Sequence, residues 1–157
     1  MTLQDFTVGA ASIPMDGSRR HFLLRNLVDC YTSVANGGWG TLSSSDTARV
    51  IELKEGWYVK HVWVRLVKIG TVGATILTQI GDTIGGDAWI ATDMNIGTTG
   101  TLNQVKGSLA TDTNGATQGY MYLADNYILM AISTANFDGQ IEIVAEVIDV
   151  FGGSTIV

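Results

Sequence analysis

Residue types that carry catalysis or bind metals are scarce in this sequence. Its 157 residues include two histidines, His21 and His61, and one cysteine, Cys30. Three such residues cannot supply the four ligands of a structural zinc ion, and the sequence has no nucleophile elbow and no phosphate-binding glycine loop with a lysine. We therefore predict no catalytic residue, no cofactor and no metal site. The histidines are expected in structural or interface roles, and Cys30 as a buried thiol.

Three aspartates lie around a Gly-Gly pair in residues 80–95, "IGDTIGGDAWIATDMN", namely Asp82, Asp87 and Asp93. The segment is distantly similar to calcium-binding loops, but its spacing does not fit an EF-hand, and it does not repeat. Aspartate and glycine are also ordinary turn residues. We predict turns in this segment rather than a calcium site.

The four tryptophans, Trp39, Trp57, Trp63 and Trp89, could stack on sugar rings beside the Asp/Asn-containing loops. Three of them lie in or at the edge of expected strands, however, where packing in a core or between subunits is commoner. Trp39 lies among glycines in "NGGWG" and is either an aromatic contact for a partner or a plug folded onto its own sheet. A sugar-binding or enzymatic domain therefore stays an alternative.

The charge is unevenly divided along the chain. The net charge is −6, yet residues 1–68 contain eight Lys/Arg and six Asp/Glu, whereas residues 69–157 contain one lysine and nine acids. An acidic chain is a poor general binder of nucleic acid, so no nucleic-acid partner is expected. The division reflects either solubility alone or a basic face that docks on an acidic partner. In the second case "DGSRRHFLLR", residues 16–25, is the docking arm.

The pattern of residues predicts one all-β domain. Nineteen glycines, one proline and short apolar runs between Gly/Asn/Asp turns favour strands, and no apolar run approaches the ~20 residues that cross a bilayer. The N-terminus also has no signal-like region, so we expect a soluble chain without a membrane partner. Asp138-Gly139 and residues 124–126 are expected to close hairpins. Strands are predicted at residues 3–8, 22–32, 47–53, 57–69, 73–80, 87–91, 119–123, 127–133 and 140–150, with irregular segments at 9–20 and 92–118.

The strand in "EGWYVKHVWVRLVKIG", residues 55–70, carries apolar side chains on both faces. Simple alternation places Val62, Val64 and Leu66 on one face, and the row Trp57, Val59, His61, Trp63 and Arg65 on the other. If the first face fills a core, the second needs cover, and another subunit is the simplest cover. Two glutamates of the last strand, Glu142 and Glu146, could pair with Lys60, Arg65 and Lys68 across strands or between chains.

From about residue 47 the order of features resembles the capsid decoration (cement) proteins of tailed bacteriophages. The similarity rests on three segments, "ARVIELKEGWYVKHVWVRLVKIG", "ATILTQIGD" with "DAWIATDMNIGTTGT", and "YMYLADNYILMAISTANFDGQIEIVAEVIDV". It covers roughly two-thirds of the chain and is a pattern of strands and turns, without a catalytic signature. The resemblance implies a single antiparallel β-sandwich or jelly-roll-like domain, residues 22–157, preceded by an extended N-terminal arm, residues 1–21.

The same resemblance implies a function. The expected protein is a non-enzymatic virion component that assembles in the host cytoplasm, decorates the capsid surface as a homotrimer and contacts the major capsid protein. A tail, fibre or host-binding module is the alternative. The residues expected to contact a neighbouring subunit or the capsid are Arg19, Arg20, His21, Phe22, Trp39, Trp57, His61, Trp63 and Arg65.

Overall fold

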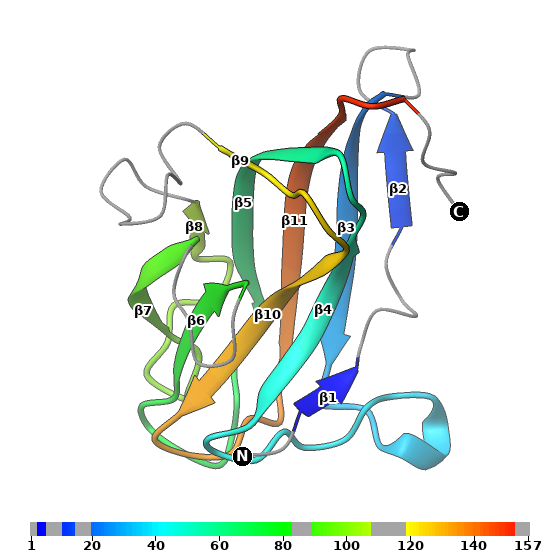
Figure 1. Cartoon of the computed structure of the whole chain (residues 1–157). Helices are drawn as coiled ribbons and strands as arrows, with labels where there is room; N and C mark the ends of the chain where they lie inside the picture. The colour runs from blue at the N-terminus through cyan, green and yellow to red at the C-terminus, as the bar shows by residue number, and fades with distance from the viewer. Residues whose placement is uncertain (1–2, 6–10, 15–19, 83–88, 108–118, 153–157) are drawn as a thin grey trace.

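The computed structural model describes residues 3–5, 11–14, 20–82, 89–107 and 119–152, and it shows two β-sheets packed face to face (Figure 1). Sheet A contains, in spatial order, β1 (Leu3–Asp5), β4 (Thr47–Leu53), β10 (Asn126–Ser133), β6 (Leu77–Gly81) and β7 (Ile90–Asn95). Sheet B contains β2 (Ala11–Pro14), β3 (His21–Asp29), β11 (Gln140–Asp149), β5 (Trp57–Lys68) and β8 (Val105–Gly107), and β9 (Tyr120–Met121) also pairs with β5. The predicted all-β sandwich is confirmed.

Neighbouring strands are antiparallel except β1 and β4, which are parallel. The chain repeatedly crosses from one sheet to the other, so that β4 in sheet A precedes β5 in sheet B, and β10 in sheet A precedes β11 in sheet B. The two predicted hairpins are therefore wrong. Residues 124–126 lead from β9 in sheet B to β10 in sheet A, and Asp138-Gly139 leads from β10 to β11.

The core lies between the sheets and is built by alternation along the central strands. On β11 the inward row is Ile141, Ile143, Ala145 and Val147, all fully buried. Phe22, Leu24 and Val28 of β3 lie beside this row, and Ile128, Met130 and Ile132 of β10 are buried in sheet A. Asn26 of β3 joins the sheets, because its Nδ2 donates to the Val50 carbonyl at 2.7 Å.

A β-bulge in β5 changes which side chains reach the core. Glu146 of β11 pairs with His61, but the next residue, Val147, pairs with Val59, so Lys60 is an extra residue in β5. A bulge reverses the alternation on one side of it. Trp57 and Val59 therefore point inward together with Val62, Val64 and Leu66. The predicted outward row of Trp57, Val59, His61, Trp63 and Arg65 is corrected: its first two members belong to the core.

The described parts of the expected N-terminal arm, residues 1–21, extend both sheets. Leu3–Asp5 forms β1 beside β4, and Ala11–Pro14 forms β2 beside β3. Two segments expected to be irregular contain strands. Residues 9–20 contain β2, and residues 92–118 contain most of β7 and all of β8. Between β3 and β4, residues Val34–Asn36 form a 3-10 turn. Among the described residues no helix is long and apolar enough to span a membrane.

Candidate functional site

The outer face of sheet B gathers the charged and aromatic side chains that the sequence singled out. Residues alternate between the two faces of a strand, so those between the core positions of β3, β11 and β5 point away from the sandwich. We call this surface the outer face of sheet B and define it by His21, Leu23, Arg25, His61, Trp63, Arg65, Glu142, Val144 and Glu146. Val144 of the central strand pairs with Arg25 on one side and with Trp63 on the other.

Two arginines share one carboxylate on this face. Arg65 donates from Nε to Oε2 of Glu142 at 2.9 Å, and Arg25 donates from Nε to Oε1. The Glu142 side chain is 9% exposed, whereas those of Arg25 and Arg65 are 52% and 41% exposed. One carboxylate against two guanidiniums leaves one positive charge in excess. A guanidinium has five N–H donors, so each arginine keeps donors beyond the one that Glu142 occupies.

A second carboxylate of β11 lies four residues further along the same face. His21 Nε2 is 2.8 Å from Oε1 of Glu146, and Lys60 Nζ is 3.4 Å from the same oxygen. Burial alone would raise the pKa of Glu146, but the hydrogen bonds from His21 and Lys60 and the charges of these groups outweigh it and lower the pKa. The predicted pairing of Lys60 and Arg65 with Glu146 and Glu142 is confirmed, whereas Lys68 lies over the Tyr31 ring.

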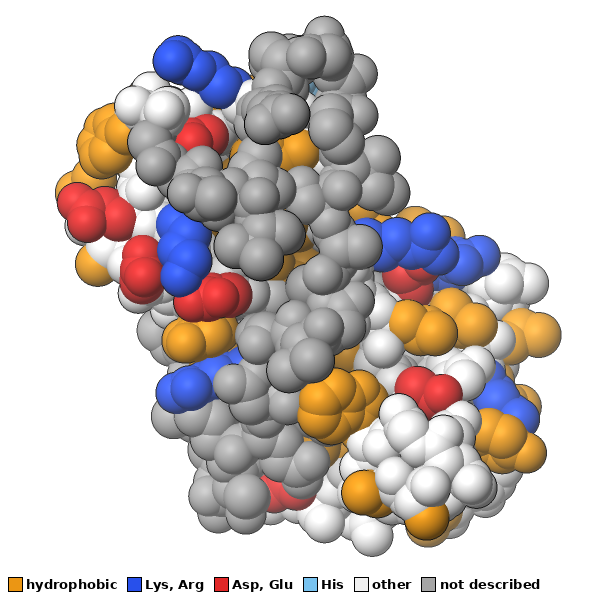
Figure 2. Space-filling view, turned by 90° about the vertical axis from the view of Figure 1, so that its right-hand side faces the viewer, with side chains coloured by type: hydrophobic (Ala, Val, Ile, Leu, Met, Phe, Trp, Pro, Cys, Tyr) orange, Lys and Arg blue, Asp and Glu red, His pale blue; other side chains and the backbone are white. Residues whose placement is uncertain are grey.

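An apolar hollow lies on the face beside the arginine pair. Its volume is about 380 Å³, and it is lined by Leu23, Trp63, Val64, Arg65, Val105, Glu142 and Val144. The Trp63 indole packs against Gly107 of β8. A Cβ atom on residue 107 would lie only 2.9 Å from Cδ1 of Trp63, so the glycine permits this close approach. The face therefore combines an apolar depression with exposed cations. Figure 2 looks onto the edge of the sandwich at β2, and there Lys/Arg side chains lie next to Asp/Glu side chains, with hydrophobic side chains near them.

The structure separates the nine predicted contact residues into groups. His21, His61, Trp63 and Arg65 lie on the outer face of sheet B, and Arg20 is exposed just before β3. Arg19 lies outside the described residues. Two predictions need correction: Phe22 and Trp57 are buried in the core, where their rings meet edge to face at 5.1 Å between centroids. Trp39 is partly buried and packs against the core, as expected of a plug.

Neither Leu23 nor Val144 is among the nine predicted contact residues, although both alternate with core positions. The signal that could have found Val144 is its place between Glu142 and Glu146 in the row of "EIVAE" that opposes the apolar one. Leu23 could have been found from its place between Phe22 and Leu24, both of which are buried. Leu23 and Val144 come next to Trp63 only because their strands pair in one sheet, and no local sequence pattern predicts which strands pair.

The buried reactive groups are engaged in structural contacts. The Tyr122 hydroxyl donates to Asp82 at 3.1 Å and accepts from Trp89 Nε1 at 3.2 Å, while burial and the Asp82 charge raise its pKa. Burial and the nearby Asp29 charge raise the pKa of Cys30 to about 12. No group of three His, Cys, Asp or Glu side chains suitable for a metal occurs in the described part of the chain. Asp87 and the Asp93 side chain lie outside it.

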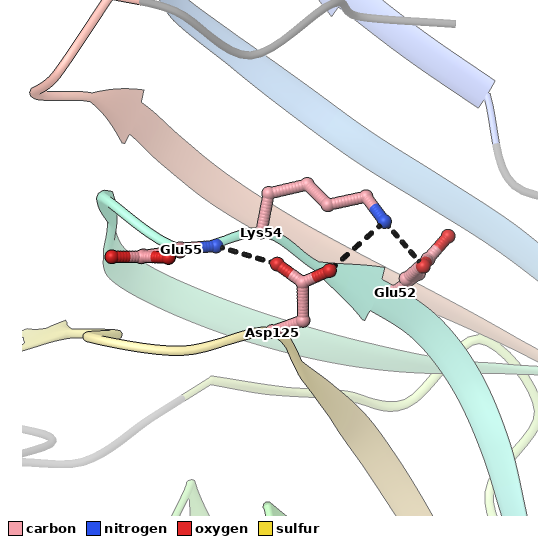
Figure 3. A network of polar contacts seen from close by, with 4 residues as sticks. All are labelled: Glu52, Lys54, Glu55 and Asp125. Carbon is pink, nitrogen blue, oxygen red and sulfur yellow. Dashed lines mark hydrogen bonds and ion pairs between the residues drawn. The ribbon is translucent and has the colours of Figure 1, made fainter.

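An acidic turn between β4 and β5 lies at one end of the sandwich (Figure 1), and Figure 3 shows its polar contacts. Lys54, which follows β4, bridges Glu52 and Asp125, and Asp125 Oδ1 accepts from the Glu55 backbone N–H at 2.9 Å. Three carboxylates against one ammonium leave two negative charges in excess. The Glu55 side chain points away from the other three (Figure 3). We call this segment, residues 52–55 with 123–125, the end turn.

Exposed apolar side chains accompany the end turn. Leu123 is 75% exposed, and Val150 and Phe151 are 46% and 62% exposed. They gather around Gly56, because the Gly56 N–H donates to Tyr122, the Gly56 carbonyl accepts from Val150, and Phe151 packs where a Gly56 Cβ would stand. The end turn thus offers an exposed leucine beside unbalanced carboxylates, whereas the outer face of sheet B offers an apolar hollow beside unbalanced guanidiniums.

Comparisons with solved structures place this fold among chains of phage capsids. A chain in "Capsid of Ralstonia phage GP4" superposes with a TM-score of 0.62 at 13% identity, over 98% of this chain and 100% of the other. A chain in "Cyanophage Pam1 capsid asymmetric unit" gives 0.56 at 14% identity, over 90% and 95%. At such identities the likeness concerns the fold. No protein-family model and no curated protein matches the sequence.

Proposed function

We propose that this chain is a non-enzymatic structural protein of a tailed-phage virion, which decorates the outside of the capsid and stabilises it as a homotrimer. It assembles in the host cytoplasm and binds the major capsid protein. Its contacts bridge neighbouring capsomers, so that expansion of the shell or internal pressure must also break them. The observation that carries the proposal is the structural match over the whole chain to a chain of a phage capsid.

The extent of that match supports the proposal. Because the alignment covers 98% of this chain and 100% of the other, the two chains are similar in size and the likeness in fold extends along both. The resemblance of the strand pattern to decoration proteins points in the same direction.

The surface chemistry supports a role in binding rather than catalysis. The charged groups on the outer face of sheet B pair with one another across strands, and such pairs fix register and orientation. Exposed Arg20 lies just before β3 and belongs to the basic segment that we propose to lie on an acidic capsid surface. This contact would weaken at high salt, because the Debye screening length falls to ~3 Å at 1 M ionic strength.

Copy number in purified particles tests the proposal. Quantitative mass spectrometry of particles from the phage that encodes the chain is expected to find hundreds of copies per particle. A few to tens of copies would favour the alternative, a tail, fibre or host-binding part. Absence from the particle would refute a virion role altogether.

A further inference from the structure

We propose that the end turn of one copy docks into the apolar hollow on sheet B of a second copy, with Leu123 as the inserted side chain. This inference rests on the homotrimer of the proposed function and names the contact that would build it. The two patches are different parts of one surface, so the contact is heterologous and can close into a ring.

The apolar parts of the two patches match in kind. Leu123, at 75% exposed, is left in water by its own copy, and large side chains so exposed often mark contact sites when they cluster. The hollow presents Leu23, Trp63, Val105 and Val144 around about 380 Å³ of space. Insertion of the leucine would also cover Val105, which is 56% exposed. Both partners would thereby remove apolar surface from water.

The charges of the two patches are complementary. The hollow is flanked by Arg25 and Arg65, which together outweigh Glu142 by one charge. The end turn carries Glu52, Glu55 and Asp125 against Lys54 alone, and the Asp125 side chain is 63% exposed. Carboxylates near Leu123 would therefore approach guanidiniums that retain unused N–H donors, which is a favoured geometry for charge-assisted hydrogen bonds.

A symmetric contact between two sheet B faces fits less well. Each carboxylate on that face already has two cationic or histidine partners, so neither cluster offers an unbalanced negative charge to the arginines of a second copy. The patches are also well separated within one copy. Val144, in the hollow, and Val150, near Leu123, are six residues apart along one strand and its extension, or roughly 20 Å at ~3.3 Å per residue. One copy can therefore use both patches at once.

A charge exchange tests the contact without disturbing the core. Sedimentation velocity of the purified chain at about 10 μM is expected to show a trimer. Val105→Glu places a carboxylate at the hollow, and Leu123→Lys places a cation on the end turn; each alone should raise the apparent dissociation constant at least tenfold. The double variant should restore association, because the introduced ammonium of one copy would then face the introduced carboxylate of the next. Val34→Glu and Val72→Lys, at other exposed valines, should leave the trimer intact.

Each other outcome overturns the inference. A monomeric wild type would remove both this contact and the homotrimer, whereas a trimer unaffected by the two single changes would remove this contact alone. A pair of cysteine variants provides a second measurement that does not introduce charge. Oxidation of Val105→Cys mixed with Leu123→Cys should yield a disulfide-linked heterodimer, and Val34→Cys in place of Leu123→Cys should not. Copy number in virions remains an independent test of the proposed function.

Discussion

Trp57 and Trp63 lie six residues apart on β5, yet Trp57 is buried between the sheets while Trp63 lines the hollow on the outer face of sheet B. Lys60 is the extra residue between them, at the point where Glu146 and Val147 pair with His61 and Val59. The bulge lets one strand supply Trp57 to the core and Trp63 to the surface. Both the packing of the core and the set of side chains on the candidate contact face therefore depend on the bulge.

Deletion of Lys60 is expected to unfold the protein or to lower its melting temperature sharply. A regular strand would turn either Trp57 and Val59 or Val62, Val64 and Leu66 out of the core, and losing even one such side chain costs several kcal/mol. Lys60→Ala is the control, since it keeps the bulge and loses only a partly exposed ion pair, worth about 0.5 kcal/mol. Thermal melts followed by circular dichroism would contradict this account if the deletion variant melted like Lys60→Ala.

Glu142→Gln is expected to lower the free energy of unfolding by about 1–2 kcal/mol, because it removes the charge that Arg25 and Arg65 share. The guanidiniums are half exposed, so the loss should stay below that of a fully buried pair. Glu52→Gln removes an exposed partner of Lys54 and should cost less than about 0.5 kcal/mol. Urea titrations of the two variants measure the difference, and equal losses would show that the shared carboxylate has no special role.

Glu146 should contribute stability above pH 4.5 and lose it in acid. Burial would raise its pKa, but bonds and charges from His21 and Lys60 outweigh this and lower the pKa below its ordinary value of 4.5. The unfolded chain therefore binds this proton first as the pH falls, and the contribution disappears as the pH falls through the lower, folded pKa. Glu146→Gln should thus be less stable than wild type at pH 7, with a difference that shrinks below pH 4.5. Urea titrations at several pH values test it; a constant difference would rule out this linkage.

Cys30 is expected to be unreactive in the folded protein. Burial raises its pKa to about 12, and the thiolate is the form that attacks thiol reagents. Incubation with an aromatic disulfide reagent at pH 8 should leave the thiol unmodified until denaturant is added. Rapid stoichiometric modification of the native protein would show that the β3 end opens readily.

The central strands were predictable because their local patterns are unambiguous. The prediction for residues 47–53 coincides with β4, and the one for 140–150 differs from β11 by one residue. The crossings between sheets were not predictable, since Asp138-Gly139 shows that the chain reverses without showing whether the flanking strands hydrogen-bond. The edge strands β2 and β8 are short and lack an apolar pattern, so their partners β3 and β5 define them.

The candidate contact face was predictable only in part. Trp63, His61 and Arg65 stood out from their types and spacing. The bulge at Lys60 was hidden because residues on both sides of it alternate regularly, and the partner strand alone determines where the extra residue lies. Leu23 and Val144 reach the hollow through pairing of β3 and β5 with β11, which joins residues more than 70 positions apart.

A particle reconstruction by cryo-electron microscopy would show directly whether this chain decorates a capsid. On the proposed function, virions of the encoding phage should show sandwich-shaped density in groups of three on the outer surface of the shell, in contact with the major capsid protein. The reconstruction should also place each end turn against a neighbouring copy. Density for this chain confined to the tail, or its absence from the shell, would contradict the claim.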